Sequence, residues 1–256
     1  MNMVLVGAIG NRMVRESAAA GPDGEGGNFL YRGSMRDFMK RHLLPSAVRP
    51  RRILFGPAAG AVMEIDPASE FRMWLGLIEA ELSRHFRRLV YRGARCFDIG
   101  GAAGYHAVML AKLSGERVAV FEPGAGWPEK IERELARNGL EGVVAPVLIG
   151  SSVSDGCTTI DQAARTIFTP DFVKMDIEGA EAEALKGASA VLSSRKPHLI
   201  VEVHGAEVER QCLELLGGHG YSPTIVNPRG FLKEYRPIEN NRWLVCEGRW
   251  PAQPSA

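Results

Sequence analysis

The sequence predicts an α/β fold in which helices cover both faces of a doubly wound, mostly parallel sheet. From Cys96 onward, short apolar runs alternate with segments of helical periodicity, which is the pattern of successive strand and helix units. Parallel strands are buried on both faces and therefore read as short apolar runs, as they do here. A chain of 256 residues that is 45% hydrophobic is also long enough to bury a sizeable core.

The alternating region predicts five strands, the helices between them and an antiparallel edge. Apolar runs predict strands at residues 97–99, 118–121, 143–149, 172–175 and 199–203. Helices are expected up to residue 113 and over residues 128–138, 160–166, 179–192 and 207–216. Two strand-like segments in the tail are expected to form an antiparallel edge of the sheet, at residues 221–226 and 243–246.

Before this region, the chain predicts an N-terminal extension rather than a second domain. Residues 1–28 are expected to form a mobile arm, because their last third is rich in glycine, proline and acids. Apolar spacing predicts a short helix over residues 29–44 and a small hairpin from residues 52–55 and 61–65. A further helix, opened by Ser69 and Glu70, is expected to carry an apolar side as far as Phe86. The expected division is an arm (1–28), a helical and hairpin cap (29–95) and the main domain (96–250).

Charge and cysteine usage exclude several classes of protein. The net charge of +1 gives no electrostatic basis for binding nucleic acid or an anionic membrane, so neither is expected as a partner. The four cysteines are widely spaced and form no Cys-x-x-Cys pair, which predicts free thiols in a reducing compartment. The apolar N-terminus is too short for a membrane span and makes a poor signal peptide. We therefore expect a cytoplasmic enzyme, and the sequence leaves its oligomeric state open.

A glycine-rich turn joins the first strand of the main domain to the next helix. Asp98 ends the strand, and three glycines allow the backbone to approach a ligand, namely Gly100, Gly101 and Gly104. The spacing is neither the Gly-x-Gly-x-x-Gly of dinucleotide binders nor a Walker phosphate loop. A carboxylate at this turn would repel a pyrophosphate but would pair with a cationic amino-acid group. The turn therefore favours a nucleoside that carries an ammonium group, such as S-adenosylmethionine.

A second acid stands where the ribose of a nucleoside is expected. Glu122 follows the apolar run 118–121, about 20 residues beyond the glycine turn. A carboxylate at the end of the second strand can accept hydrogen bonds from two adjacent ribose hydroxyls. We therefore predict that Glu122 binds the ribose of the cofactor.

The most specific motif lies in residues 173–205. The string VKMDIEGAEAEALKGASAVLSSRKPHLIVEVHG resembles the signature of the FkbM-type methyltransferases. The glycine turn, the Phe-Glu-Pro run at 121–123 and the Trp-x-Gly-x-x-Glu segment that begins at Trp74 are similar to the same family. Members usually carry Gly-Ala-Asn in the first turn, where this chain has Gly-Gly-Ala at 100–102.

The resemblance implies a Rossmann-like class I methyltransferase fold, with a seven-stranded sheet whose last strand is antiparallel. It also implies S-adenosylmethionine as the methyl donor and O-methylation of hydroxyls on sugars, macrolides or other natural products. The expected partner is therefore a small-molecule or glycan hydroxyl acceptor.

Methyl transfer to an alcohol requires alignment of the methyl group and removal of the hydroxyl proton. His204, whose unshifted pKa range suits proton removal near neutrality, is the predicted general base. Glu202 lies two residues earlier on the same strand, so both side chains share one face. Asp176, just past another strand, is assigned to the catalytic residues and to the cofactor site. These three residues also have the ligand types for a divalent cation, which is an alternative to the metal-free base.

Two other functions stay open from the sequence. The missing turn asparagine motivates a methyltransferase fold that binds ligands without catalysis. A nicotinamide-dependent oxidoreductase ranks lower, because the glycine spacing differs from that of dinucleotide-binding turns.

Overall fold

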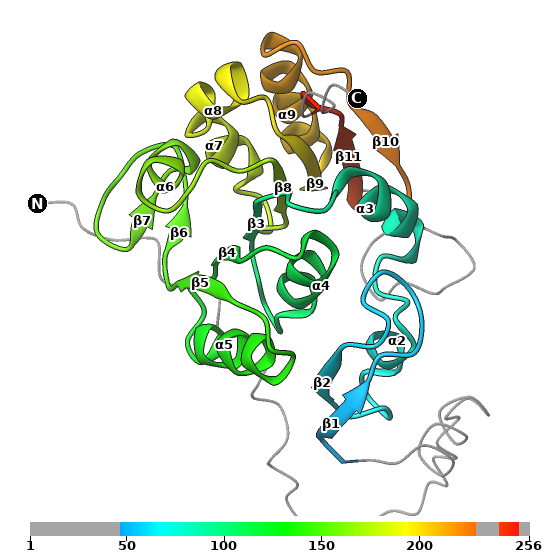
Figure 1. Cartoon of the computed structure of the whole chain (residues 1–256). Helices are drawn as coiled ribbons and strands as arrows, with labels where there is room; N and C mark the ends of the chain where they lie inside the picture. Colours follow the sequence, from blue (N-terminus) through cyan, green and yellow to red (C-terminus); the bar gives the residue numbers. More distant parts are fainter. Residues whose placement is uncertain (1–46, 229–240, 251–256) are drawn as a thin grey trace, which may run out of the picture. The chain divides into compact units, whose positions relative to one another are not determined.

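The computed structural model describes residues 47–228 and 241–250, which belong to one compact unit, Met39–Ala256. At its centre is a seven-stranded sheet with the strand order β10-β11-β9-β8-β3-β4-β5, and helices lie on both sides of it (Figure 1). Strands β9, β8, β3, β4 and β5 are mutually parallel, whereas β11 runs antiparallel to both of its neighbours. The predicted fold class is confirmed, including a last strand that runs antiparallel.

The strands of this sheet lie where the apolar runs predict them. They are β3 (Cys96–Ile99), β4 (Val118–Phe121), β5 (Gly142–Ala145), β8 (Phe172–Met175), β9 (His198–His204), β10 (Thr224–Val226) and β11 (Asn241–Cys246). The central strands β3, β4 and β8 are buried throughout, because helices cover both faces of the sheet. The predicted antiparallel edge is confirmed by the pairing of β10 with β11.

The helices divide between the two faces and bury one apolar cluster under each. The helices of the main domain are α4 (Tyr105–Ser114), α5 (Trp127–Arg137), α6 (Ile160–Thr166), α7 (Glu181–Lys186), α8 (Ser189–Ser194) and α9 (Ala206–Gly218). Apolar side chains of α4 and α5 belong to one cluster, and those of α6 to α9 belong to the other. Within residues 47–228 and 241–250, none of the helices combines the length and the apolar character that crossing a membrane requires.

Two predicted elements of the main domain are each divided in the structure. The expected strand 143–149 is β5 and a separate short strand, β6 (Leu148–Ile149), which pairs with β7 (Cys157–Thr158) in a sheet of its own. Pro146, which has no amide proton for a strand ladder, lies at the break. The expected helix 179–192 is interrupted at Gly187, where a Cβ atom would lie 2.1 Å from the Gly150 carbonyl oxygen. A side chain would not fit at Gly187, and α7 ends at the residue before it.

The segment before the main domain contains the predicted hairpin and a broken helix. Strands β1 (Arg49–Arg52) and β2 (Val62–Ile65) pair antiparallel, so the hairpin is confirmed. Its first strand lies at residues 49–52, however, and not at the predicted 52–55. The single helix predicted from Ser69 to Phe86 is wrong, because the chain forms three pieces. They are α2 (Phe71–Leu75), η1 (Ala80–Leu82) and α3 (Ser83–Leu89).

Gly76 explains why this helix breaks. Its φ of 72° is left-handed, and a Cβ atom there would lie 1.9 Å from the carbonyl oxygen of Phe55. The apolar periodicity therefore continues through the segment while the backbone turns at the glycine.

The hairpin is attached to α5 by polar side chains. The Asn138 side-chain amide exchanges two hydrogen bonds with the Val62 backbone, at 2.7 and 2.8 Å. The buried carboxylate of Glu134 accepts from the Glu64 amide at 3.0 Å, and Arg137 binds both acids. Residues 1–28 and the helix predicted over 29–44 lie outside the described residues, and the domain boundaries stay predictions.

Candidate active site

The predicted site residues come together at the carboxyl edge of the sheet. Adjacent strands β4, β3, β8 and β9 end there side by side, and each has an acid directly after it or among its last three residues. In spatial order these are Glu122, Asp98, Asp176 and Glu202. In open α/β sheets ligands bind outside this edge, where the direction of winding reverses.

The glycines of the turn have individual structural reasons. Gly100 has a φ of 84°, and a Cβ atom on it would lie 1.8 Å from the Asp176 carbonyl oxygen. Gly101 packs on β4, because its Cβ atom would lie 2.4 Å from Val120 Cγ1. Gly104 has a φ of 83° and precedes the first turn of α4. Close packing therefore accounts for Gly100 and Gly101, and their contacts with a cofactor stay predictions.

We expect Gly100→Ala to destabilise the fold much more than Gly93→Ala. Both glycines are left-handed, at φ values of 84° and 86°, but no atom lies within 4 Å of the Cβ position of Gly93. Gly93→Ala should therefore cost only the left-handed penalty of about 1–2 kcal/mol. Gly100→Ala must also displace the Asp176 backbone, which should add at least about 2 kcal/mol. Urea unfolding measures the difference, and equal losses in the two variants would contradict the close contact.

Glu122 links the glycine turn to the loop after β4. Its Oε2 accepts a hydrogen bond from the Ala102 amide and its Oε1 accepts one from the Gly124 amide, both at 2.8 Å. A carboxylate offers about four acceptor positions, so each oxygen retains capacity for one further donor. The carboxylate is partly exposed, and it is therefore available to two neighbouring hydroxyls.

Ala102 occupies the turn position where the related family usually has asparagine. Its φ of 42° is left-handed, a conformation that asparagine and glycine adopt far more readily than alanine. Ala102→Gly should therefore stabilise the fold by about 0.5–1 kcal/mol. Ala136→Gly, the same change at an exposed position of helix α5, should destabilise it by up to about 1 kcal/mol. Thermal unfolding measures both, and a loss of stability in Ala102→Gly would contradict the strained turn.

A buried lysine connects the acids of the two central strands. Lys174 Nζ lies 3.9 Å from Asp98 Oδ1 and 3.6 Å from Asp176 Oδ2, and it donates to the Gly100 carbonyl at 3.3 Å. Burial opposes the charge on Lys174, but Asp98 and Asp176 more than compensate and raise its pKa. The ammonium group therefore holds the glycine turn and the end of β8 together.

Asp98 is buried below the surface at which a ligand would make contact. It has no exposed surface, and neither carboxylate oxygen has a hydrogen-bond partner among the described residues. Burial is the main reason that its pKa is raised, and Lys174 opposes the shift. Asp98 therefore interacts with the carboxyl edge of the sheet through its ion pair with Lys174. Its contact with the cofactor stays a prediction.

A further acid reaches this edge from the N-terminal segment. Glu79, in the left-handed conformation at a φ of 43°, places Oε2 3.3 Å from His106 Nε2. Its side chain is only 10% exposed, and its charge contributes to the raised pKa of both Asp98 and Tyr105. Glu79 therefore adds negative charge beside the glycine turn.

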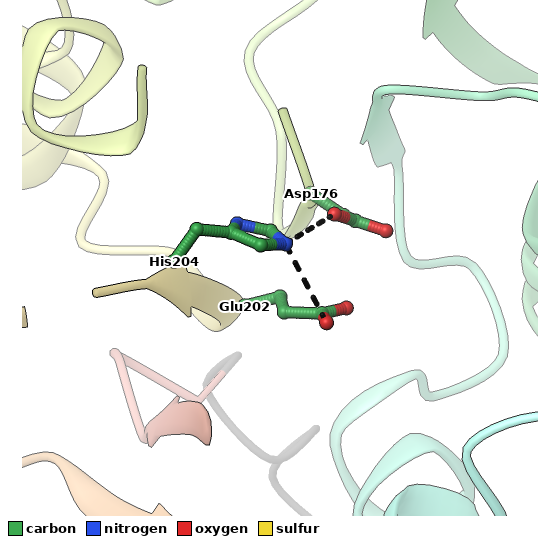
Figure 2. Close-up of side chains that lie close together, drawn as sticks. All are labelled: Asp176, Glu202 and His204. Atoms are coloured by element: carbon green, nitrogen blue, oxygen red, sulfur yellow. Dashed lines mark ion pairs between the residues drawn. The ribbon is translucent and has the colours of Figure 1, made fainter. Parts of the chain in front are cut away.

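The predicted catalytic residues form one group, the His204 cluster (Asp176, Glu202 and His204), which Figure 2 shows at the ends of β8 and β9. His204 Nε2 lies 3.6 Å from Asp176 Oδ1 and 3.6 Å from Glu202 Oε1. On the other side of the ring, Nδ1 is 2.8 Å from Oε1 of Glu181, which is fully buried. Burial opposes the charged ring, but the hydrogen bond with Glu181 raises the pKa of His204.

Three charged residues at this edge had no role assigned from the sequence. Glu181 falls at a helix start, where acids are common, and Lys174 lies within an apolar strand. Glu79 closes the Trp-x-Gly-x-x-Glu segment of the resemblance. A charged residue inside an otherwise apolar strand is the signal that identifies Lys174, because such a group must be paired.

Comparison with known proteins supports the resemblance. Residues 149–236 match the family model described as "Methyltransferase FkbM domain". No curated protein sequence matches the chain.

Solved structures show partial similarity. A methyltransferase FkbM from Methylobacillus flagellatus is 21% identical over 60% of this chain and 43% of that one, with a TM-score of 0.46. A precorrin-6y C5,15-methyltransferase from Geobacter metallireducens is 16% identical over 68% and 90%, with a TM-score of 0.49. Aeropyrum pernix fibrillarin, solved with natively bound S-adenosyl-L-methionine, is 12% identical over 62% and 68%, with a TM-score of 0.48.

The match to the FkbM structure spans less than half of that chain, so the fold assignment rests on the sheet itself. The match to the family model covers residues 149–236, which contain β8, α7 and β9 and therefore the whole His204 cluster. Over this segment, the chain is similar to the FkbM methyltransferase family.

Proposed function

We propose that the protein transfers a methyl group from S-adenosylmethionine to a hydroxyl group of a small metabolite, sugar or natural product. The observation that carries the proposal is the position of Glu122. Its carboxylate is held by the glycine turn on one side and by Gly124 on the other, with acceptor capacity left for two hydroxyls. This is the hydrogen-bonding pattern that the ribose of a nucleoside requires.

The charge at the same edge suits a cationic donor. Five carboxylates lie around the ends of β3, β8 and β9, and the cations among them are Lys174 and, when protonated, His106 and His204. The carboxylates belong to Glu79, Asp98, Asp176, Glu181 and Glu202. S-adenosylmethionine carries a sulfonium and an ammonium group, so an excess of negative charge favours its binding.

The His204 cluster is the proposed site of the acceptor hydroxyl. It lies two strands away from the glycine turn at the same edge, and Asp176 contacts both regions through Lys174 and Gly100. Displacement at a methyl group needs the acceptor oxygen in line with the sulfur and free of its proton. His204 Nε2 either takes this proton or, as argued below, binds a cation that lowers the pKa of the hydroxyl.

Calorimetric titration tests the proposal. The folded protein should bind S-adenosylmethionine and its demethylated product, and it should bind NAD much more weakly or not at all. Methyl transfer is then followed with radiolabelled donor across a panel of sugars, polyols and macrolides. Absence of donor binding by a folded sample contradicts the proposal. Binding without transfer to any acceptor favours a non-catalytic module.

A further inference from the structure

We infer that Asp176, Glu202 and His204 bind a divalent metal ion. The inference goes beyond methyl transfer, because it concerns a binding site whose occupation does not require the methyl donor. It starts from the distances in the His204 cluster, which Figure 2 shows converging between the ends of β8 and β9.

The separations fit a shared cation better than direct contact. The distances of 3.6 Å from His204 Nε2 to each carboxylate are too long for hydrogen bonds. Two ligand atoms at about 2.1 Å from one cation lie about 3.0 Å apart at right angles and about 4.2 Å apart when opposite. The two observed distances fall between these limits, and all three ligand atoms lie within 4.8 Å of one another. Rotation of the partly exposed Asp176 carboxylate would bring its oxygen closer to that of Glu202, so that all three ligand atoms could reach one cation.

His204 Nε2 independently indicates a ligand. The atom is buried and has no hydrogen-bond partner among the described residues, although it points between two carboxylates. A buried polar atom without a partner is costly, and an ion that binds there removes the cost. Glu202 supplies a carboxylate ligand that is held in place by burial, because only 2% of its side chain is exposed.

The ring of His204 is already oriented for this role. Glu181 is fully buried, accepts from the Gly179 amide at 3.0 Å and lies 2.8 Å from His204 Nδ1. A carboxylate on one ring nitrogen is the usual support of a metal-binding histidine, because it fixes the tautomer and directs the other nitrogen at the metal. Three protein ligands leave coordination positions for an acceptor oxygen.

The ligand set selects the kind of cation. Two carboxylates and an imidazole suit Mn²⁺ or Zn²⁺ better than Ca²⁺, which prefers oxygen ligands alone. A cation in this place would bind the acceptor hydroxyl, lower its pKa and allow its proton to pass to water. His204 would then be a ligand, and the metal would do the work otherwise assigned to an imidazole base.

Titration with Mn²⁺, followed by the loss of the free-ion electron paramagnetic resonance signal, tests the site without any methyl donor. The metal-free protein should bind one Mn²⁺ per chain. Asp176→Asn, Glu202→Gln and His204→Asn should each weaken binding at least about 10-fold, and Glu181→Gln should weaken it about 10-fold to 100-fold. Glu183→Gln is the matched control, because this acid lies on α7 close to Glu181 but is 52% exposed and paired with Lys186.

Circular dichroism establishes that each variant is folded before titration, and Asp176→Asn is the mildest change because its side chain is 21% exposed. No stoichiometric Mn²⁺ or Zn²⁺ binding by the folded protein overturns the proposal, as does equal affinity in the wild type and Asp176→Asn. Either result leaves His204 as the base and does not affect donor binding, which is measured separately.

Discussion

Replacing Glu122 by alanine is expected to weaken the binding of S-adenosylmethionine at least about 100-fold. The change removes the two hydrogen bonds that we propose between the carboxylate and the ribose hydroxyls, each of which would contribute about 1.5–3 kcal/mol. It also releases the amides of Ala102 and Gly124, which Glu122 holds at 2.8 Å, so the turn loses part of its support. Isothermal titration of the folded variant measures the loss.

A comparison of two ligands separates the ribose contact from this structural effect. The wild type should bind S-adenosylhomocysteine more tightly than its 2′-deoxy analogue, whereas Glu122→Ala should bind the two about equally. Glu132→Ala, at an exposed position of α5, is the control and should bind both ligands as the wild type does. If Glu122→Ala keeps the preference for the intact ribose, Glu122 is not the ribose ligand.

His204→Asn is expected to lower the rate of methyl transfer about 100-fold to 1,000-fold. The loss is expected whether the ring takes the hydroxyl proton or binds a cation, because both uses require Nε2 between Asp176 and Glu202. Affinity for the donor should change little, since the glycine turn and Glu122 are on other strands. Single-turnover measurement with a saturating acceptor from the panel gives the rate.

His219→Asn provides the matched control for this loss. His219 follows the end of α9 and interacts with Ser193 at 3.0 Å, away from the carboxyl edge, so the rate should stay at the wild-type level. A full rate in folded His204→Asn would exclude the His204 cluster as the place where the acceptor loses its proton.

The fold was predictable because its strands are short apolar runs with clear ends. Residues 118–121, 160–166 and 172–175 were predicted with the bounds that the structure has. The two wrong helix predictions fall at Gly76 and Gly187, where the chain lies against the Phe55 and Gly150 carbonyls. These contacts join segments far apart in the sequence, and periodicity within a window carries no information about them.

The sequence predicts which strand ends carry the site residues, but it does not predict the ion pairs and hydrogen bonds that connect them. Strand order alone places Asp98, Glu122 and Asp176 at one edge, since parallel strands share the direction in which they end. The pairing of Lys174 with two acids and the support of His204 by Glu181 depend on side-chain distances that no spacing rule supplies. Glu79 lies just after Gly76, where the helix predicted from Ser69 to Phe86 breaks against the Phe55 carbonyl. The position of Glu79 could therefore not be predicted from the helical pattern.

If the methyl donor binds beside Asp98 and the acceptor beside Asp176, as we propose, the shared ammonium group of Lys174 makes their binding thermodynamically interdependent. Asp98 and Asp176 share it, at 3.9 and 3.6 Å, so a positive ligand that neutralises one of these acids leaves Lys174 more available to the other. Binding of the donor would then alter the affinity for the acceptor. Reciprocity requires the factor to be the same in both directions.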